Sequence, residues 1–285
     1  MSSLREIKDH IGSVKSTLKI TSAMKLVASS KLRKAQNAIE SMRPYEEALR
    51  YALSAAKSAS RPVEVKRTEQ EGEEKTVAGK TAVVTVSSNS SLCGGFNANV
   101  IKRTLSEIGS AGDTVVFALG RKVADAVKKA GFPSERDFSE MVAHPSYEAV
   151  AALADELSAR FISGEFSSVI LVYTHFVTTS RQEVVVERYL PFETFEDEMT
   201  ETADYIVEPS PEETVEYLTP LVLGLKLYAA VLDSSAAEHS ARTIAMQTAT
   251  DNGNDLLAEL TLEYNKGRQQ KITAEILDLI GGKCE

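Results

Sequence analysis

The sequence predicts an α/β protein in which long N- and C-terminal helices form an antiparallel coiled coil and flank a central, mostly parallel-sheet α/β domain. Two observations support this fold class. Residues 1–43 and 221–285 contain no proline, so each stretch suits one long helix. Between them, short β-branched runs alternate with segments of helical apolar spacing, the order typical of a sheet covered by helices. The expected boundaries are an N-terminal helix over 1–60, a polar connector over 61–75, the central domain over 76–209 and a C-terminal helix over 210–285.

The first helix carries an apolar seam with alternating three- and four-residue spacing. Its members are Leu4, Ile7, Ile11, Val14, Leu18, Ala28, Leu32, Ala35, Ile39 and Met42, with Thr21 and Lys25 between the two halves. Such a seam requires a partner helix, and the other terminal stretch is the expected mate. Ser3 and Glu6 form a capping box that predicts where the helix starts. Because Lys25 interrupts the seam, Met24 and Lys25 are expected to face outward from the helix pair.

The C-terminal helix also has a clear start signal. Ser210 supplies a capping side chain, Pro211 stands where no amide is needed, and Glu213 occupies the third helical position. Pro220 is expected to kink or restart the helix. From Leu221 onward no strong stop occurs before Gly281-Gly282, so about 60 residues are expected to span ~90 Å. Residues 234–254 are rich in Ala, Ser and Thr, which allows a neighbouring backbone to approach closely, and residues 272–280 are apolar again.

The central region has the pattern of alternating strands and helices. The expected strands are Thr81–Val86, Thr114–Leu119, Ser168–Tyr173 and Glu183–Leu190, and the expected helices are Asn97–Ile108, Arg121–Ala130 and Ser146–Ser163. The connector Arg61–Lys75 is charged and nearly free of apolar residues, so it is interpreted as a solvated loop or disordered insertion.

Charge is distributed unevenly along the chain. Residues 1–43 hold nine basic and three acidic residues, a local net charge of +6, which leaves −15 on the rest of a chain whose total is −9. A basic helix in an acidic protein suits nucleic acid, anionic lipid or an acidic protein surface, and a solvated helix face is the plainer reading. Cys93 and Cys284 are too few for a disulfide framework, which is consistent with a reducing compartment. No transmembrane helix is expected, because Lys226 interrupts the apolar stretch Leu221–Leu232, and the N-terminus lacks a signal-peptide pattern.

The sequence contains no recognisable catalytic constellation. Gly79-Lys80-Thr81 resembles the end of a phosphate-binding loop, but the first glycine is absent and the motif precedes a strand. The turn Ser91–Asn97 follows a strand and opens a helix, so it either offers backbone amides to an anion or simply makes a tight turn. The histidines His10, His144, His175 and His239 have no carboxylate or cysteine partners at metal-ligand spacing. We therefore expect no catalytic residue, no cofactor and no metal.

Several short motifs, in order along the whole chain, carry a family resemblance. They are Leu4–Lys8, Ile20–Ala28, Leu92–Asn97, Ala249–Gly253, Tyr264-Asn265-Lys266 and Ile272–Glu275. With these motifs the chain resembles the gamma subunit of F-type ATP synthases. Two positions depart from the family pattern: Gly267 stands where alanine is common, and Gly282-Lys283 replaces a common Gly-Ala. The glycine is expected to loosen the helix by about 1 kcal/mol.

The resemblance implies a non-catalytic rotor stalk that couples proton-driven rotation of a c ring to ATP synthesis or hydrolysis. Its implied partners are the alpha and beta subunits of a catalytic ring, the epsilon subunit and the c ring, with no nucleic acid and with membrane contact only through the complex. The implied location is peripheral, on the cytoplasmic side of a bacterial inner membrane. The positions that match family contacts are, for the beta subunit, Met24, Lys25, Arg268, Gln269, Thr273 and Glu275, and, for the foot that meets the c ring, Tyr205 and Glu208.

Two other classes of function stay open at this point. Strand–helix alternation also suits an α/β nucleotide-binding enzyme, although the missing phosphate loop and catalytic groups argue against it. The basic first helix also suits a nucleic-acid-binding coiled coil, although overall acidity and the lack of interleaved aromatic residues argue against that class. Nucleotide binding by the purified chain would favour the first alternative, and steeply salt-dependent binding to duplex DNA would favour the second.

Overall fold

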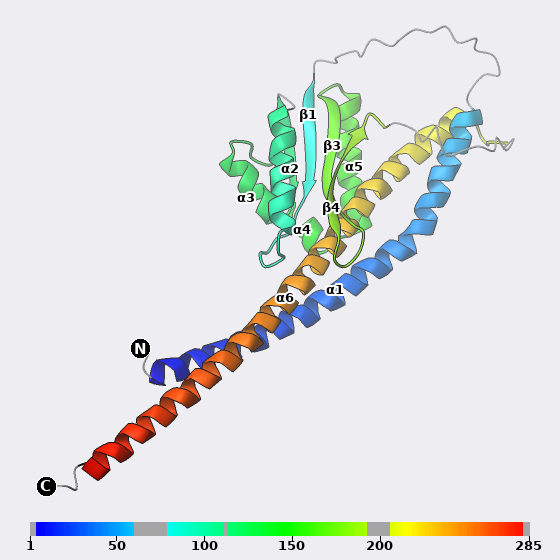
Figure 1. Cartoon of the computed structure of the whole chain (residues 1–285). Coiled ribbons are helices and arrows are strands. Elements are labelled where there is room, and N and C mark those ends of the chain that lie inside the picture. Colours follow the sequence, from blue (N-terminus) through cyan, green and yellow to red (C-terminus); the bar gives the residue numbers. More distant parts are fainter. Residues whose placement is uncertain (1–3, 60–78, 111–112, 193–205, 282–285) are drawn as a thin grey trace. The chain divides into compact units, whose positions relative to one another are not determined.

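The computed structural model describes residues 4–59, 79–110, 113–192 and 206–281, which fall into two compact units (Figure 1). One unit combines Met1–Ser30 with Arg242–Glu285, and the other comprises Lys31–Ala241. Two long helices contribute to both units: α1 (Leu4–Ala59) has 56 residues and α6 (Pro211–Gly281) has 71. The terminal helices predicted from the absence of proline are therefore confirmed. Ser3 and the connector Arg61–Lys75 lie outside the described residues.

The start of α6 follows the capping chemistry predicted for it. The Ser210 hydroxyl accepts a hydrogen bond from the backbone N–H of Glu213 at 3.2 Å, and the Ser210 carbonyl accepts from Thr214 N–H at 3.1 Å. Of the kink or restart predicted at Pro220, the restart is wrong, since α6 continues through that residue to Gly281, and the kink stays a prediction. The proline removes one backbone donor, but Val222 and Leu223 directly after it are buried, so packing outweighs that loss.

A four-stranded sheet forms the centre of the larger unit. Its strands are β1 (Lys80–Val86), β2 (Thr114–Leu119), β3 (Phe166–Phe176) and β4 (Gln182–Leu190), and their order is β2-β1-β3-β4. Strand β1 pairs in parallel with β2 and β3, whereas β3 pairs antiparallel with β4. The mostly parallel sheet is thus confirmed. Helices α2 (Phe96–Ser110), α3 (Arg121–Lys129) and α5 (Tyr147–Ile162) match predicted segments, and the short α4 (Ser139–Ala143) was not predicted.

Helices cover both faces of the sheet (Figure 1), so the strands are buried on both sides. Alternate residues of β1 show this division: Val84 packs with Leu157 of α5 and Leu227 of α6, whereas Val83 packs with Val123 and other residues of α2 and α3. Strands buried on both sides are typically continuous runs of β-branched residues, and these runs allowed the strands to be predicted from the sequence. The α6 segment 222–232 therefore forms part of the domain core.

By length and composition, α6 is also able to cross a membrane. Within the described residues, Pro211–Ile280 contains an 18-residue window of mean hydropathy 1.5, which corrects the expectation that no segment qualifies. The window is 44% buried inside the protein. Because residues 222–232 of this helix pack against the sheet, the apolar signal is explained by core packing.

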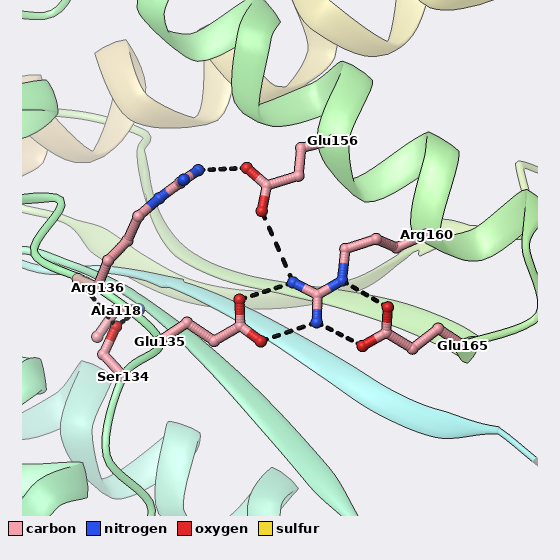
Figure 2. A network of polar contacts seen from close by, with 7 residues as sticks. All are labelled: Ala118, Ser134, Glu135, Arg136, Glu156, Arg160 and Glu165. Carbon is pink, nitrogen blue, oxygen red and sulfur yellow. Dashed lines mark hydrogen bonds and ion pairs between the residues drawn. The ribbon is translucent and has the colours of Figure 1, made fainter.

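A charged network fastens the edge of the domain at the end of α5 (Figure 2). The Arg160 guanidinium donates to both oxygens of Glu135 at 2.6 and 2.8 Å and to both oxygens of Glu165 at 2.9 and 2.6 Å, and it lies 3.6 Å from Glu156. The same guanidinium lies 4.4 Å from the ring centroid of Phe166. These contacts raise the pKa of Arg160 and lower the pKa of Glu165. One side chain therefore joins three segments of the domain.

Candidate functional site

The smaller unit consists of an antiparallel helix pair with a regular register. Four contacts define it: Leu4 with Gly267, Leu18 with Gly253, Thr21 with Thr250, and Lys25 with Gln247. The residue number rises on α1 as it falls on α6, which establishes the antiparallel direction. An apolar cluster of Ile7, Ile11, Val14, Leu18, Leu257, Leu260 and Tyr264 fills the contact between these points. The predicted seam is confirmed.

The seam follows strict heptads on both helices. Buried residues recur every seven positions on α1 at Ile7, Val14, Thr21 and Ala28. On α6 the matching series is Met246, Gly253, Leu260 and Gly267, in which the two apolar residues are buried and the two glycines meet leucines. A strict seven-residue repeat favours left-handed supercoiling of a helix pair. The two helices therefore meet along one narrow line of side chains.

The glycines of α6 allow close helix approach at two places. A Cβ atom on Gly253 would lie 2.7 Å from Leu18 Cδ2, and one on Gly267 would lie 2.9 Å from Leu4 Cδ2. Both distances are shorter than normal contacts between carbon atoms. Gly267, which departs from the family pattern, therefore makes room for Leu4.

Met24 and Lys25 lie beside the polar part of the seam. Both side chains are half-buried, and the Lys25 ammonium donates to the Gln247 side chain on the opposite helix. Gln247 in turn donates to Asp251 at 2.7 and 2.9 Å. Lys25 thus bridges the two helices, which differs from the expectation that it faces away from them. Lys25 lies seven residues after Leu18 on the same face of α1, so its long apolar stem carries the ammonium along the seam to the partner helix.

Three apolar side chains near Met24 are strongly exposed and were not singled out from the sequence. Ile20, Leu26 and Val27 are 60%, 70% and 57% exposed. These positions do not belong to the heptad repeat of the seam. Apolar residues outside the repeat were therefore the sequence signal that could have identified this exposed surface. Exposed apolar residues gathered on one short segment are typical of a protein interaction surface.

The other four expected beta-contact residues lie on the last turns of α6. Arg268, Gln269, Thr273 and Glu275 are all exposed. The Thr273 hydroxyl donates to the Gln269 carbonyl at 2.9 Å, and Glu275 lies 3.9 Å from Lys271, so both make local contacts along the helix. Beyond them Ile276, Leu277, Leu279 and Ile280 are between 51% and 73% exposed. This end of α6 presents polar groups followed by an apolar tip.

The expected foot is described only in part. Tyr205 lies outside the described residues. Glu208 is exposed and precedes Pro209 and the Ser210 cap of α6. The neighbouring Ile206 is 92% exposed among the described residues.

The crevice that usually binds ligands in open parallel sheets is filled in this chain. Strand order places the switch point between β1 and β3, at the carboxyl ends of both strands. Here Cys93 and Phe96, from the loop and helix after β1, pack with Phe176 of β3 and with Ala237 and Ala241 of α6. The Asn97 side chain accepts from Ser88 N–H at 3.2 Å and so closes the turn. The chain's own helix thus occupies the place where a nucleotide would bind.

The other residues considered for phosphate or metal binding do not form a site among the residues that the structure describes. Gly79 leads into β1, and Lys80 lies 3.9 Å from Asp113, so this stretch is a strand entry. His175 contacts Asp233, a carboxylate partner that sequence spacing missed because the two residues are 58 positions apart. Across residues 4–59, 79–110, 113–192 and 206–281, no group of three or more His, Cys, Asp or Glu side chains is arranged to hold a metal ion.

A groove of about 470 Å³ lies within the larger unit, between α1, α6 and strands β3 and β4. Charged side chains line it from every side, among them Arg43, Glu46, Glu187 and Lys226. Lys226 lies 3.6 Å from Glu187. Burial raises the pKa of the Glu46 carboxyl, although Arg50 and Arg43 partly offset that effect. The groove is therefore balanced in charge.

Comparison with known proteins identifies the class to which this helix pair and domain belong. The ATP synthase family model matches residues 3–283. The ATP synthase gamma chains of Phocaeicola vulgatus and Flavobacterium johnsoniae are 49% and 41% identical to the chain over 295 and 285 residues, and each alignment covers 98% or more of both proteins.

Solved structures of related assemblies share the fold. The rotor of Euglena gracilis mitochondrial ATP synthase matches with a TM-score of 0.62 at 18% identity, covering 94% of this chain and 98% of that chain. The central stalk and c ring of Tetrahymena thermophila mitochondrial ATP synthase match with a TM-score of 0.55 at 21% identity, covering 81% of this chain and 99% of that chain. The chain therefore belongs to the ATP synthase family, among its gamma chains.

Proposed function

We propose that this chain transmits torque between a c ring and the beta subunits of a catalytic ring, with the helix pair as the shaft. The family match over residues 3–283 is the observation that carries the proposal. A rotating shaft acts as a ligand whose orientation gives each beta subunit different contact energies in turn. Such a shaft needs length, stiffness and an asymmetric surface. Two paired helices of unequal length, 56 and 71 residues, supply these properties.

Two surfaces of the helix pair suit changing contacts with beta subunits. The first contains Met24 and Lys25 with the exposed apolar residues around them, and the second contains Arg268, Gln269, Thr273 and Glu275. An arginine has several fixed donors and a glutamine has both donor and acceptor groups, so their hydrogen bonds depend on orientation. Such bonds form at one shaft angle and break at the next.

The charge of the first helix supports contact with an acidic partner. Residues 1–43 carry a net charge of +6 in an otherwise acidic chain. Long-range attraction of this kind steers association without fixing one geometry, as a sliding contact requires. The beta subunits are the proposed partners here, and the alpha subunits complete the ring around the shaft.

The foot is proposed to lie around Tyr205 and Glu208, where the chain would meet the c ring and the epsilon subunit. Glu208 and Ile206 are exposed beside the start of α6. The chain would then sit peripherally on the cytoplasmic side of a bacterial inner membrane and touch the membrane only through the complex. The chain is proposed to consist of four parts: an N-terminal helix over 1–60, a polar connector over 61–75, a central domain over 76–209 and a C-terminal helix over 210–285.

Reconstitution with alpha, beta, epsilon and c subunits tests the proposal. The wild-type chain should restore ATP-driven proton pumping, and a complex without it should not pump. Arg268→Ala should slow steady-state ATP hydrolysis or weaken assembly while circular dichroism of the free chain stays unchanged, because an exposed arginine contributes little to its own helix. Arg121→Ala is the matched control, since Arg121 is an exposed arginine on α3. Wild-type turnover and assembly in Arg268→Ala would remove that residue from the contact surface.

A cysteine scan tests the foot separately. Cysteine at Glu208 or Tyr205 should crosslink to subunit c in the assembled complex, and cysteine at exposed Asp125 on α3 serves as control. Failure at both foot positions would place the contact with the c ring elsewhere on the chain, without affecting the proposed shaft.

A further inference from the structure

One carboxylate of α6 ties this helix to the end of the central sheet. Asp233 Oδ1 accepts a hydrogen bond from the backbone N–H of Phe176, the last residue of β3, at 3.0 Å. Asp233 Oδ2 contacts Nδ1 of His175, the preceding residue of the same strand. The Asp233 side chain is only 18% exposed, so water competes weakly for its oxygens.

The helix surface that follows Asp233 is built from small residues, with the buried serines Ser234 and Ser240 among alanines. Ala236 and Ala237 are fully buried, and Ala237 packs with Cys93 and Phe96 in the filled crevice between β1 and β3. Apolar burial stabilises such a contact in proportion to its area and has no preferred direction. Methyl groups alone therefore resist separation of helix and sheet better than they resist sliding or turning of the helix.

Hydrogen bonds along α6 have a preferred direction, so they resist sliding and turning of the helix. The buried Tyr189 hydroxyl donates to the Leu223 carbonyl at 2.9 Å, and the Ser240 hydroxyl donates to the Thr179 carbonyl at 2.7 Å. Both bonds join neutral groups. A charged pair also joins this helix to the sheet, since Lys226 lies 3.6 Å from Glu187 of β4. Asp233 differs from all of these contacts because its carboxylate meets two nitrogens of one strand end, and charge-assisted hydrogen bonds are roughly twice as strong as neutral ones.

We propose that Asp233 is the positioning residue that fixes the rotational and axial register of α6 against the α/β domain, so that torque reaching the domain passes into the helix without slip. The proposal rests on the rotor function proposed above and names the point where domain and shaft helix engage. Removing the charge-assisted tie should raise the population of slipped registers by roughly 10- to 100-fold.

Hydrogen exchange at the Phe176 amide measures this tie directly in the full chain. In Asp233→Ala the amide loses its acceptor, so its exchange should become roughly 10- to 100-fold faster. Asp233→Asn keeps an acceptor oxygen for this N–H and should give an intermediate rate. Asp125→Ala removes an exposed carboxylate from α3 of the same unit and should leave the rate unchanged.

The coupling ratio of the reconstituted complex distinguishes torque transfer from simple stabilisation. Asp233→Ala should lower the number of protons pumped per ATP hydrolysed, and Asp233→Asn should partly restore it. Unchanged exchange at Phe176 would overturn the proposal, because the tie would not exist. Faster exchange with an unchanged ratio would also overturn it, since Asp233 would then be structural only. Failure of the wild-type chain to support any pumping would instead reject the rotor function itself.

Discussion

The helix pair and the α/β domain are stabilised in different ways. In the domain, strands are buried on both faces, and residues such as Val83, Val84 and Leu157 are fully inaccessible. In the helix pair, buried residues form one line per helix, while Leu26, Leu262 and Leu277 are more than 60% exposed. Folding of this chain alone therefore explains the buried residues of the domain, but it gives no packing role to these exposed leucines of the pair. We propose that such residues meet partner subunits.

This contrast predicts that equal substitutions have unequal effects on stability. Leu157→Ala on α5 creates an enclosed cavity in the domain core and should lower the free energy of unfolding by about 3–5 kcal/mol. Leu260→Ala in the helix pair should cost only about 1–3 kcal/mol, because the seam is a narrow stripe with solvent on both sides and water can fill the gap. Urea denaturation of both variants, followed by circular dichroism, provides the measurement. Equal losses would show that the seam is as tightly enclosed as the core.

The charged network of the domain gives the next largest expected effect. Arg160→Ala removes the common partner of Glu135 and Glu165 and should lower the free energy of unfolding by about 2–3 kcal/mol. Arg160→Lys keeps the charge but not the planar fork, so it should recover less than half of the loss. Thermal unfolding of both variants measures this difference. A lysine variant as stable as wild type would show that charge alone matters.

The network also predicts a pH effect of definite sign. Arg160 lowers the pKa of Glu165 in the folded state. A depressed carboxyl pKa contributes stability that is present above the unfolded value of 4.5 and is lost as the pH falls through the folded pKa. Glu165→Gln should therefore lose stability at neutral pH and approach wild type in acid.

Glycine substitutions test how closely the two helices of the pair approach. Gly253→Ala gains about 1 kcal/mol of helix propensity, but its Cβ would meet both Leu18 Cδ2 at 2.7 Å and Leu18 Cγ at 3.3 Å. Overpacking of this kind costs about 1–3 kcal/mol, so a net loss of up to about 2 kcal/mol is expected. Gly267→Ala meets only the flexible end of Leu4 and should be neutral or stabilising. Amide exchange of α6 compares the two variants, and an opposite order would reject the described register.

Local patterns in the sequence were sufficient to predict the described elements other than the short α4, but not the contacts between distant segments. The heptad residues Ile7 and Val14 and the Ser210 cap depend on neighbours within a few positions, so spacing revealed them. The contact of Gly267 with Leu4 requires the register of two helices, and that of Asp233 with His175 requires the end of β3 to meet α6. The restart expected at Pro220 was wrong because burial of later residues outweighs a local penalty.

The smallest expected effect concerns Glu46, which lies in the groove of the larger unit. Burial raises the pKa of its carboxyl above the usual 4.5. A raised carboxyl pKa contributes stability below the unfolded pKa, and that contribution is lost as the pH rises through the folded pKa. The ionised Glu46 carboxylate therefore slightly lowers the free energy of unfolding at neutral pH. Glu46→Gln should remove it and stabilise the chain by less than about 1 kcal/mol, since solvent screens a half-exposed group.

Asp125 provides the control for this prediction, because it is exposed on α3 and is not among the charges that shift the pKa of Glu46. Asp125→Asn should leave the dependence of unfolding on pH close to that of wild type, whereas Glu46→Gln should gain stability relative to wild type only as the pH rises above about 4.5. Denaturation midpoints from pH 4 to 8, on the order of one point per pH unit, resolve the two curves. A constant gain at every pH would mean that packing of the amide, and not removal of a buried charge, stabilises the variant. The groove would then tolerate the ionised carboxylate because Arg43 and Arg50 fully offset its burial.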